Sequence, residues 1–172
     1  MDGEHMMNNI EHLLVHEFGH ALGLLHAHGI RCEGTMPTNN CVGVGVGNYF
    51  DTMAYETIGL HFNAWAKAKL GWFLNAELGT ITQSGIYSIS NLESQPNTLS
   101  SAGPKVYKIK PSSNSNKTPI WIEFRKAVGF DKGIATPALG GIYGGGGEVP
   151  PYNISDNQDG IMIYKEGFEG NV

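Results

Sequence analysis

The sequence lacks several features that define large classes of proteins. It carries 11 lysine and arginine residues against 16 aspartate and glutamate residues, a formal net charge of −5, without a basic cluster. This balance argues against a nucleic-acid partner, because binding to the phosphate backbone depends on lysine and arginine. No apolar run approaches the roughly 20 residues of a membrane-spanning helix. The stretch MDGEHMMNN has neither the basic start nor the apolar core of a signal peptide.

Histidine, in contrast, is concentrated in one segment, HEFGHALGLLHAH, at residues 16–28. His16 and His20 are four apart, so both imidazoles lie on the same face of an α-helix. Gly23 can take the left-handed conformation that ends a helix, which would bring His26 back toward the first two histidines. Three neutral imidazoles with an open fourth position are typical of a catalytic zinc site.

The same helix is expected to have a packing face. Asn8 is a candidate N-cap with Glu11 in the capping-box position, which predicts a helix that begins near residue 9. A row of apolar residues runs along the helix, roughly 200° around its axis from the histidines. We expect one face to bind a metal and the opposite face to pack through Ile10, Leu14, Phe18 and Leu22.

Glu17 is the candidate general base. It lies about 100° around the helix from His16, which is poorly aimed for a metal ligand but within reach of a water on the metal. The other histidines are expected to be surface or packing residues, although one of them, His12, could line a cleft one turn before His16. These remaining histidines are His5, His12, His28 and His61.

The full string from His16 to His26 matches the extended signature H-E-x-x-H-x-x-G-x-x-H and resembles the metzincin metallopeptidases. Metzincins also carry a tight turn with a methionine beneath the zinc, and FDTMAY supplies Met53 after the third histidine. Tyr55 matches the spacing at which some metzincins place a tyrosine near the metal. The resemblance implies a role for Tyr55 in stabilising the oxyanion, with a packing or surface role as the alternative.

The next segments are most similar to the gametolysin-type metzincins and their bacterial relatives. HFNAWAKAKLGWF contains a short helix that Asn63 can cap and Gly71 can end. Together with WIEFRKAVGFD, it extends the resemblance over most of residues 8–131. The resemblance implies a zinc endopeptidase, secreted or extracellular, that hydrolyses extracellular or cell-wall proteins.

Metzincins also have a sheet subdomain upstream of the zinc helix, for which this chain has no counterpart. We therefore expect residues 1–76 to correspond to the zinc-binding C-terminal part of such a catalytic domain. The alternative to a peptidase is a catalytically incomplete, zinc-containing module that binds protein or carbohydrate.

Cysteine is scarce. Cys32 and Cys41 are the only two, and they flank a loop between His26 and Met53. Their position favours a disulfide that closes this loop in an oxidising compartment, with two free thiols as the alternative.

Residues 77–172 have a different composition. Short β-rich runs separated by Gly, Pro, Ser and Asn predict an antiparallel sandwich or barrel, so the expected fold class is α+β. Glu123 and Arg125 share one face of a predicted strand, which favours an ion pair or hydrogen bonds over catalysis. The segment SDNQDG offers oxygen ligands for a possible calcium ion from Asp156, Asn157 and Asp159. A solvated turn is the preferred interpretation of this segment.

Overall fold

The computed structural model describes residues 3–32, 41–45, 48, 50–54, 60–94, 103–110, 118–135 and 159–165. Within them it has a mixed α+β architecture with two α-helices, α1 (Gly3–Ala21) and α2 (Ala64–Lys69). The strands are β1 (Gly29–Cys32), β2 (Cys41–Val44), β3 (Leu78–Ile81), β4 (Val106–Ile109), β5 (Ile120–Arg125) and β6 (Gly160–Lys165). Two 3-10 helices complete the elements, Asn75–Glu77 and Gly129–Ala135.

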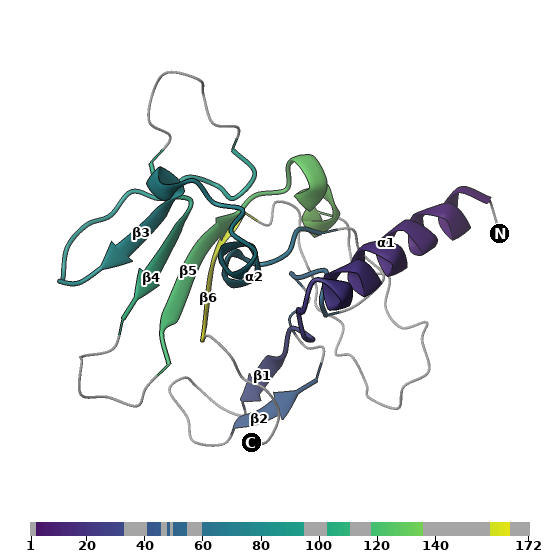
Figure 1. The fold of residues 1–172 in the computed structure, drawn as a ribbon, viewed down its shortest axis with the longest axis horizontal. Coiled ribbons are helices and arrows are strands. Elements are labelled where there is room, and N and C mark those ends of the chain that lie inside the picture. Colours follow the sequence, from purple (N-terminus) through teal and green to yellow (C-terminus); the bar gives the residue numbers. More distant parts are fainter. Residues whose placement is uncertain are drawn as a thin grey trace.

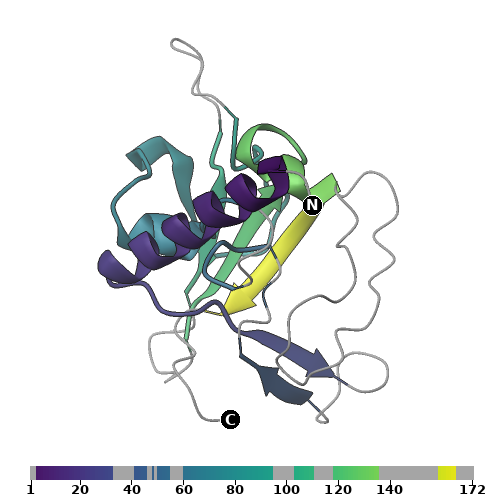
Figure 2. The ribbon, with the colours of Figure 1, turned by 90° about the vertical axis from the view of Figure 1, so that its right-hand side faces the viewer.

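The two β-sheets lie apart. The antiparallel pair β1–β2 is separate from a four-stranded sheet with the order β3-β4-β5-β6 (Figures 1 and 2). Helix α2 packs against β5, while α1 projects to one side of the larger sheet (Figure 1). Among the described residues, no helix is long and apolar enough to cross a membrane.

The larger sheet confirms an α+β fold but is not wholly antiparallel. Strands β4, β5 and β6 are antiparallel neighbours, whereas β3 runs parallel to β4. A parallel pair needs a long connection that returns the chain to the same end, and the sequence between β3 and β4 is long enough for one. Strands β3 to β6 therefore form an open mixed sheet, in place of the predicted antiparallel sandwich or barrel.

Two buried clusters meet at α2. Ala66 belongs to the first, and Ala64, at the start of the same helix, belongs to the second. The first cluster comprises Leu24, Met53, Phe62 and Ala66. The second comprises Ala64, Leu92, Val106 and Trp121. Helix α2 is thus the link between the sheet and the region that contains the histidines.

The limits of α2 are those that the sequence predicts. The Asn63 side chain accepts a hydrogen bond from the backbone N–H of Ala66 at 2.8 Å. Gly71 has a φ of 71° at the other end, where the Trp72 N–H bonds to the Lys67 carbonyl at 2.9 Å. Both ends follow local capping rules.

Two predictions about α1 are wrong. The helix begins at Gly3 rather than near residue 9, so Asn8 lies inside it and is not its N-cap. The apolar row expected to pack is exposed by 52% at Ile10, 63% at Leu14, 59% at Phe18 and 36% at Leu22.

The buried face of α1 is instead the one that contains Gly19. A Cβ at this position would lie 2.3 Å from Met53 Sδ and 2.9 Å from Phe62 Cε1. Because glycine has no side chain, the helix approaches Met53 and Phe62 closely on this face and turns its apolar row outward.

Candidate metal centre

Three histidines converge where α1 ends. His16, His20 and His26 each offer one ring nitrogen, and these atoms all lie within 4.8 Å of one another. His16 is buried, His20 is half-buried and His26 is exposed, so the cluster opens to solvent on one side. The arrangement forms a three-histidine group that could hold a metal ion.

Hydrogen bonds define the orientation of two of the rings. His16 Nδ1 lies 2.8 Å from the Thr52 carbonyl oxygen, and His20 Nδ1 lies 2.9 Å from the Leu24 carbonyl oxygen. A carbonyl oxygen only accepts, so each Nδ1 carries a hydrogen and Nε2 is the nitrogen that each ring can offer to a metal ion. Both rings therefore have the tautomer that a metal ligand requires.

The two Nε2 atoms face each other 3.1 Å apart. Two unprotonated nitrogens at this distance repel each other, so a proton or a metal ion between them would stabilise the arrangement. Tetrahedral zinc with Zn–N bonds of 2.0–2.1 Å places its nitrogen ligands about 3.3 Å apart, close to the observed separation. The separation of these two nitrogens is thus one that a single metal ion could bridge.

Local backbone geometry brings His26 to the cluster. Gly23 has a φ of 82°, the Gly23 N–H bonds to the His20 carbonyl at 2.9 Å, and the Leu24 N–H bonds to the Gly19 carbonyl at 3.0 Å. This is a Schellman motif, which ends α1 and turns the chain back. Beyond His26, the Ala27 N–H donates to the Met53 carbonyl at 2.8 Å.

The turn that carries Met53 lies next to the histidine segment, because the Thr52 carbonyl contacts His16 and the Met53 carbonyl accepts from Ala27. Met53 is 1% exposed and belongs to the first buried cluster. The Asp51 carboxylate holds the turn by accepting hydrogen bonds from the backbone N–H groups of Met53 at 2.7 Å and Asn63 at 3.0 Å. Burial raises the pKa of Asp51 to about 6, against the effect of these two hydrogen bonds.

This shifted pKa predicts a pH-dependent stability. The folded chain binds the Asp51 proton more tightly than the unfolded chain, whose ordinary pKa is 3.8. The stabilisation that comes from this tighter proton binding is therefore complete below pH 3.8 and is lost as the pH rises through about 6. The free energy of unfolding falls by about 3 kcal/mol over this range. Urea unfolding between pH 4 and pH 7 should show Asp51→Asn gaining on the wild type by most of this amount. Parallel pH curves for the two proteins would contradict the raised pKa.

Glu17 lies beside the cluster without belonging to it. Its side chain is exposed, whereas the neighbouring His16 is buried. The pKa of His26 is lowered by partial burial and then by His20, His16 and His28, while the negative charge of Glu17 acts in the opposite direction. A carboxylate thus acts electrostatically on the open side of the histidine cluster.

Two further predictions concern residues that lie wholly or partly outside the described structure. Tyr55 lies outside the described residues, so its role stays a prediction. The backbones of Cys32 and Cys41 are paired across β1 and β2. Their side chains lie outside the described part of the structure, and the disulfide also stays a prediction.

The remaining histidines are not part of the three-histidine group. His12 is half-buried and His28 is exposed. His61 Nε2 lies 2.8 Å from Glu93 Oε1, within hydrogen-bond distance and partly buried. His5 has its side chain outside the described part.

The calcium candidates are only partly described. Asp159 accepts a hydrogen bond from the Ala127 N–H at 3.2 Å, and its carboxylate lies 3.8 Å from Lys126 Nζ. Asp156 and Asn157 lie outside the described residues, so the calcium site stays a prediction.

Sequence reasoning missed several parts of the centre. The carbonyls of Leu24 and Thr52 orient two histidines, and backbone groups leave no residue-type signal. Gly19, which permits the contact with Met53, did offer a signal, because glycine in the interior of a helix is unfavourable without a packing reason.

The assignment of the metal centre rests on the sequence motif and on the geometry of the three histidines. Comparison with known proteins finds no family model that matches the chain, no significantly similar curated protein and no significantly similar solved structure. The chain is thus a mixed α+β protein with three histidines that could bind a metal ion.

Proposed function

We propose that the chain is a zinc-dependent endopeptidase of the metzincin type, similar to the gametolysin family, that cleaves extracellular or cell-wall proteins outside the cell. One observation carries the proposal. The Nε2 atoms of His16 and His20 face each other at 3.1 Å while both Nδ1 atoms are engaged by carbonyls. The position of Glu17 next to His16 supports hydrolysis over a purely structural metal site.

The chemistry divides between the metal and the chain. Zinc, when bound by His16, His20 and His26, supplies a Lewis acid that lowers the pKa of water to about 7. Glu17 accepts a proton from the attacking water and then delivers it to the departing amine of the cleaved peptide. We further propose that the Tyr55 hydroxyl donates a hydrogen bond to the oxyanion.

Hydrolysis of a denatured protein by the purified chain with zinc tests this function. Cleavage that disappears on treatment with phenanthroline supports the peptidase. Stoichiometric zinc binding without any cleavage contradicts it and favours the alternative, a zinc-containing module that binds protein or carbohydrate.

Zinc binding has its own test. His26→Ala removes one of three ligands and should lower zinc affinity by more than about 100-fold, beyond the loss typical of outer partners. His28→Ala is the matched control, since His28 is an exposed histidine two residues away that is absent from the three-histidine group. Competition with a chromophoric chelator measures both. Equal losses in the two variants would contradict the ligand assignment.

A further inference from the structure

We propose that Glu123, Arg125 and Asp131 are positioning residues for the metal centre. They hold the backbone around residues 60–64, which in turn holds the Thr52 carbonyl that orients His16. The inference rests on the proposed metal centre, because it concerns the ring orientation of one of its ligands. None of the three residues contacts the histidine cluster directly in the described structure.

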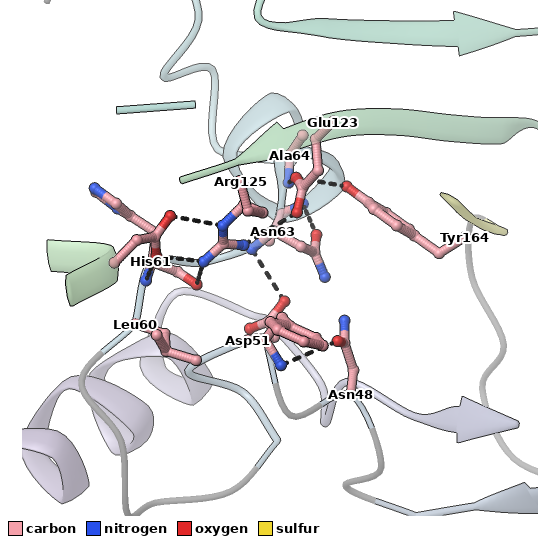
Figure 3. A network of polar contacts seen from close by, with 12 residues as sticks. Asn48, Asp51, Leu60, His61, Asn63, Ala64, Glu123, Arg125 and Tyr164 are labelled. Carbon is pink, nitrogen blue, oxygen red and sulfur yellow. Dashed lines mark hydrogen bonds and ion pairs between the residues drawn. The ribbon is translucent and has the colours of Figure 1, made fainter. Parts of the chain in front are cut away.

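The three side chains form a fully buried charged cluster at the end of β5. Glu123 and Asp131 are 0% exposed and Arg125 is 1% exposed. Arg125 donates to Glu123 Oε1 at 3.0 Å (Figure 3). Through Nε it also donates to Asp131 Oδ2 at 2.6 Å. Hydrogen bonds and charge from both carboxylates raise the pKa of Arg125 despite its burial, so Arg125 stays charged. Buried charges are costly, and apolar residues often fill such space equally well.

The carboxylate oxygens also hold the backbone at the start of α2. Glu123 Oε2 accepts hydrogen bonds from the Ala64 N–H at 2.6 Å and from the Tyr164 hydroxyl at 3.1 Å. Asp131 Oδ1 accepts one from the His61 N–H at 3.1 Å. Arg125 donates to the His61 carbonyl oxygen at 3.5 Å. The peptide groups from His61 to Ala64 are therefore fixed from the side of the sheet (Figure 3).

The same segment holds the methionine turn from the other side. The Asn63 N–H donates to Asp51 Oδ2 at 3.0 Å, and the Thr52 N–H donates to the His61 carbonyl at 3.4 Å. The Thr52 hydroxyl donates to the Leu60 carbonyl. Thr52 is thus held through its amide and its hydroxyl, while its own carbonyl oxygen lies 2.8 Å from His16 Nδ1.

This chain of contacts gives the buried charges a role beyond stability. The partner of the second ring nitrogen determines the tautomer and orientation of a ligating histidine, and its loss typically lowers metal affinity 10–100-fold. Displacing the peptides of residues 60–64 would displace the Thr52 carbonyl and release the His16 ring.

The test uses variants that preserve side-chain size. Glu123→Gln and Asp131→Asn each replace one acceptor oxygen in the cluster by an NH₂ group. Glu77→Gln is the matched control, because Glu77 is also buried, pairs with Lys105 at 2.7 Å and accepts the Leu74 N–H at 2.9 Å. Neither of these two contacts involves residues 60–64. Urea unfolding of the metal-free proteins gives the stability loss of each variant.

Two readouts separate positioning from stability. The first is zinc affinity, measured by competition with a chelator. The second is the fraction of the His16 ring that carries its hydrogen on Nδ1, measured by ¹⁵N NMR of the metal-free chain. We expect zinc affinity to fall about 10–100-fold in both cluster variants, with a lower Nδ1–H fraction, and to stay within about twofold in Glu77→Gln.

Unchanged affinity and an unchanged His16 tautomer in folded Glu123→Gln and Asp131→Asn proteins would overturn the proposal and leave the cluster a purely structural role. If Glu123→Gln does not fold, Asp131→Asn decides the question. A wild-type chain that binds zinc without cleaving protein would refute the peptidase alone. A wild-type chain that binds no zinc would refute the metal centre, and with it the positioning role.

Discussion

Replacing Glu17 by glutamine is expected to lower protein hydrolysis by about 10²–10⁴-fold, because the amide cannot accept a proton from the attacking water. Zinc affinity should stay near that of the wild type. Glu17 is exposed, lies outside the three-histidine group and has the same size as its replacement. Initial rates on a denatured protein, with zinc content measured on the same samples, check both parts of this expectation.

Glu11→Gln provides the control for the change of charge. Glu11 is an exposed glutamate on the same helix, six residues before Glu17. Its variant should retain both hydrolysis and zinc. Full activity in Glu17→Gln would contradict the role of Glu17 as general base, and loss of zinc would indicate that Glu17 contributes to the metal site itself.

The second large effect is expected at Arg125. Arg125→Met leaves Glu123 and Asp131 buried without the cation that pairs with both, at 3.0 Å to Glu123 Oε1 and 2.6 Å to Asp131 Oδ2. Breaking a buried ion pair in this way typically lowers the free energy of unfolding by about 3–5 kcal/mol. Urea unfolding near pH 7 measures the change.

An exposed pair on the same strand end gives the comparison. Lys126 Nζ lies 3.8 Å from Asp159 Oδ2, with the two side chains 47% and 39% exposed. Lys126→Met should change the free energy of unfolding by less than about 1 kcal/mol, as is usual for surface ion pairs. Similar small losses in both variants would mean that the carboxylates around Arg125 are compensated by other groups.

The apolar row of α1 shows where local pattern failed. Periodicity predicted a packing face through Leu14 and Phe18, yet these side chains are 63% and 59% exposed. The spacing of apolar residues indicates that a helix has an apolar side but not which neighbour covers it. The close contact is made through Gly19 instead, which contributes no hydrophobicity to such a pattern.

The sequence pattern also did not predict that β3 pairs with β4 in parallel. Both strands show the short β-rich composition that predicted them, but their relative direction is decided by how β4 packs beside β3 and β5. Strands as short as β3 and β4, with four residues each, have a similar composition whether they pair in parallel or antiparallel.

What the sequence by itself determined follows from rules that act over a few residues. The spacing of His16 and His20, the left-handed turn at Gly23 and the Asn63 cap of α2 depend on helix geometry and capping, which operate within one or two turns. The pairing of Glu123 with Arg125 followed from the two-residue period of a strand.

Only the tertiary structure decided which groups orient the histidines and what holds those groups in turn. The Thr52 carbonyl contacts His16, which lies 36 residues away in the sequence. The Glu123 carboxylate accepts a hydrogen bond from the Ala64 N–H, which lies 59 residues away. Such contacts join backbone groups, which every residue carries, to side chains far away in the chain. Their partners are therefore determined by how the helices and the sheet pack.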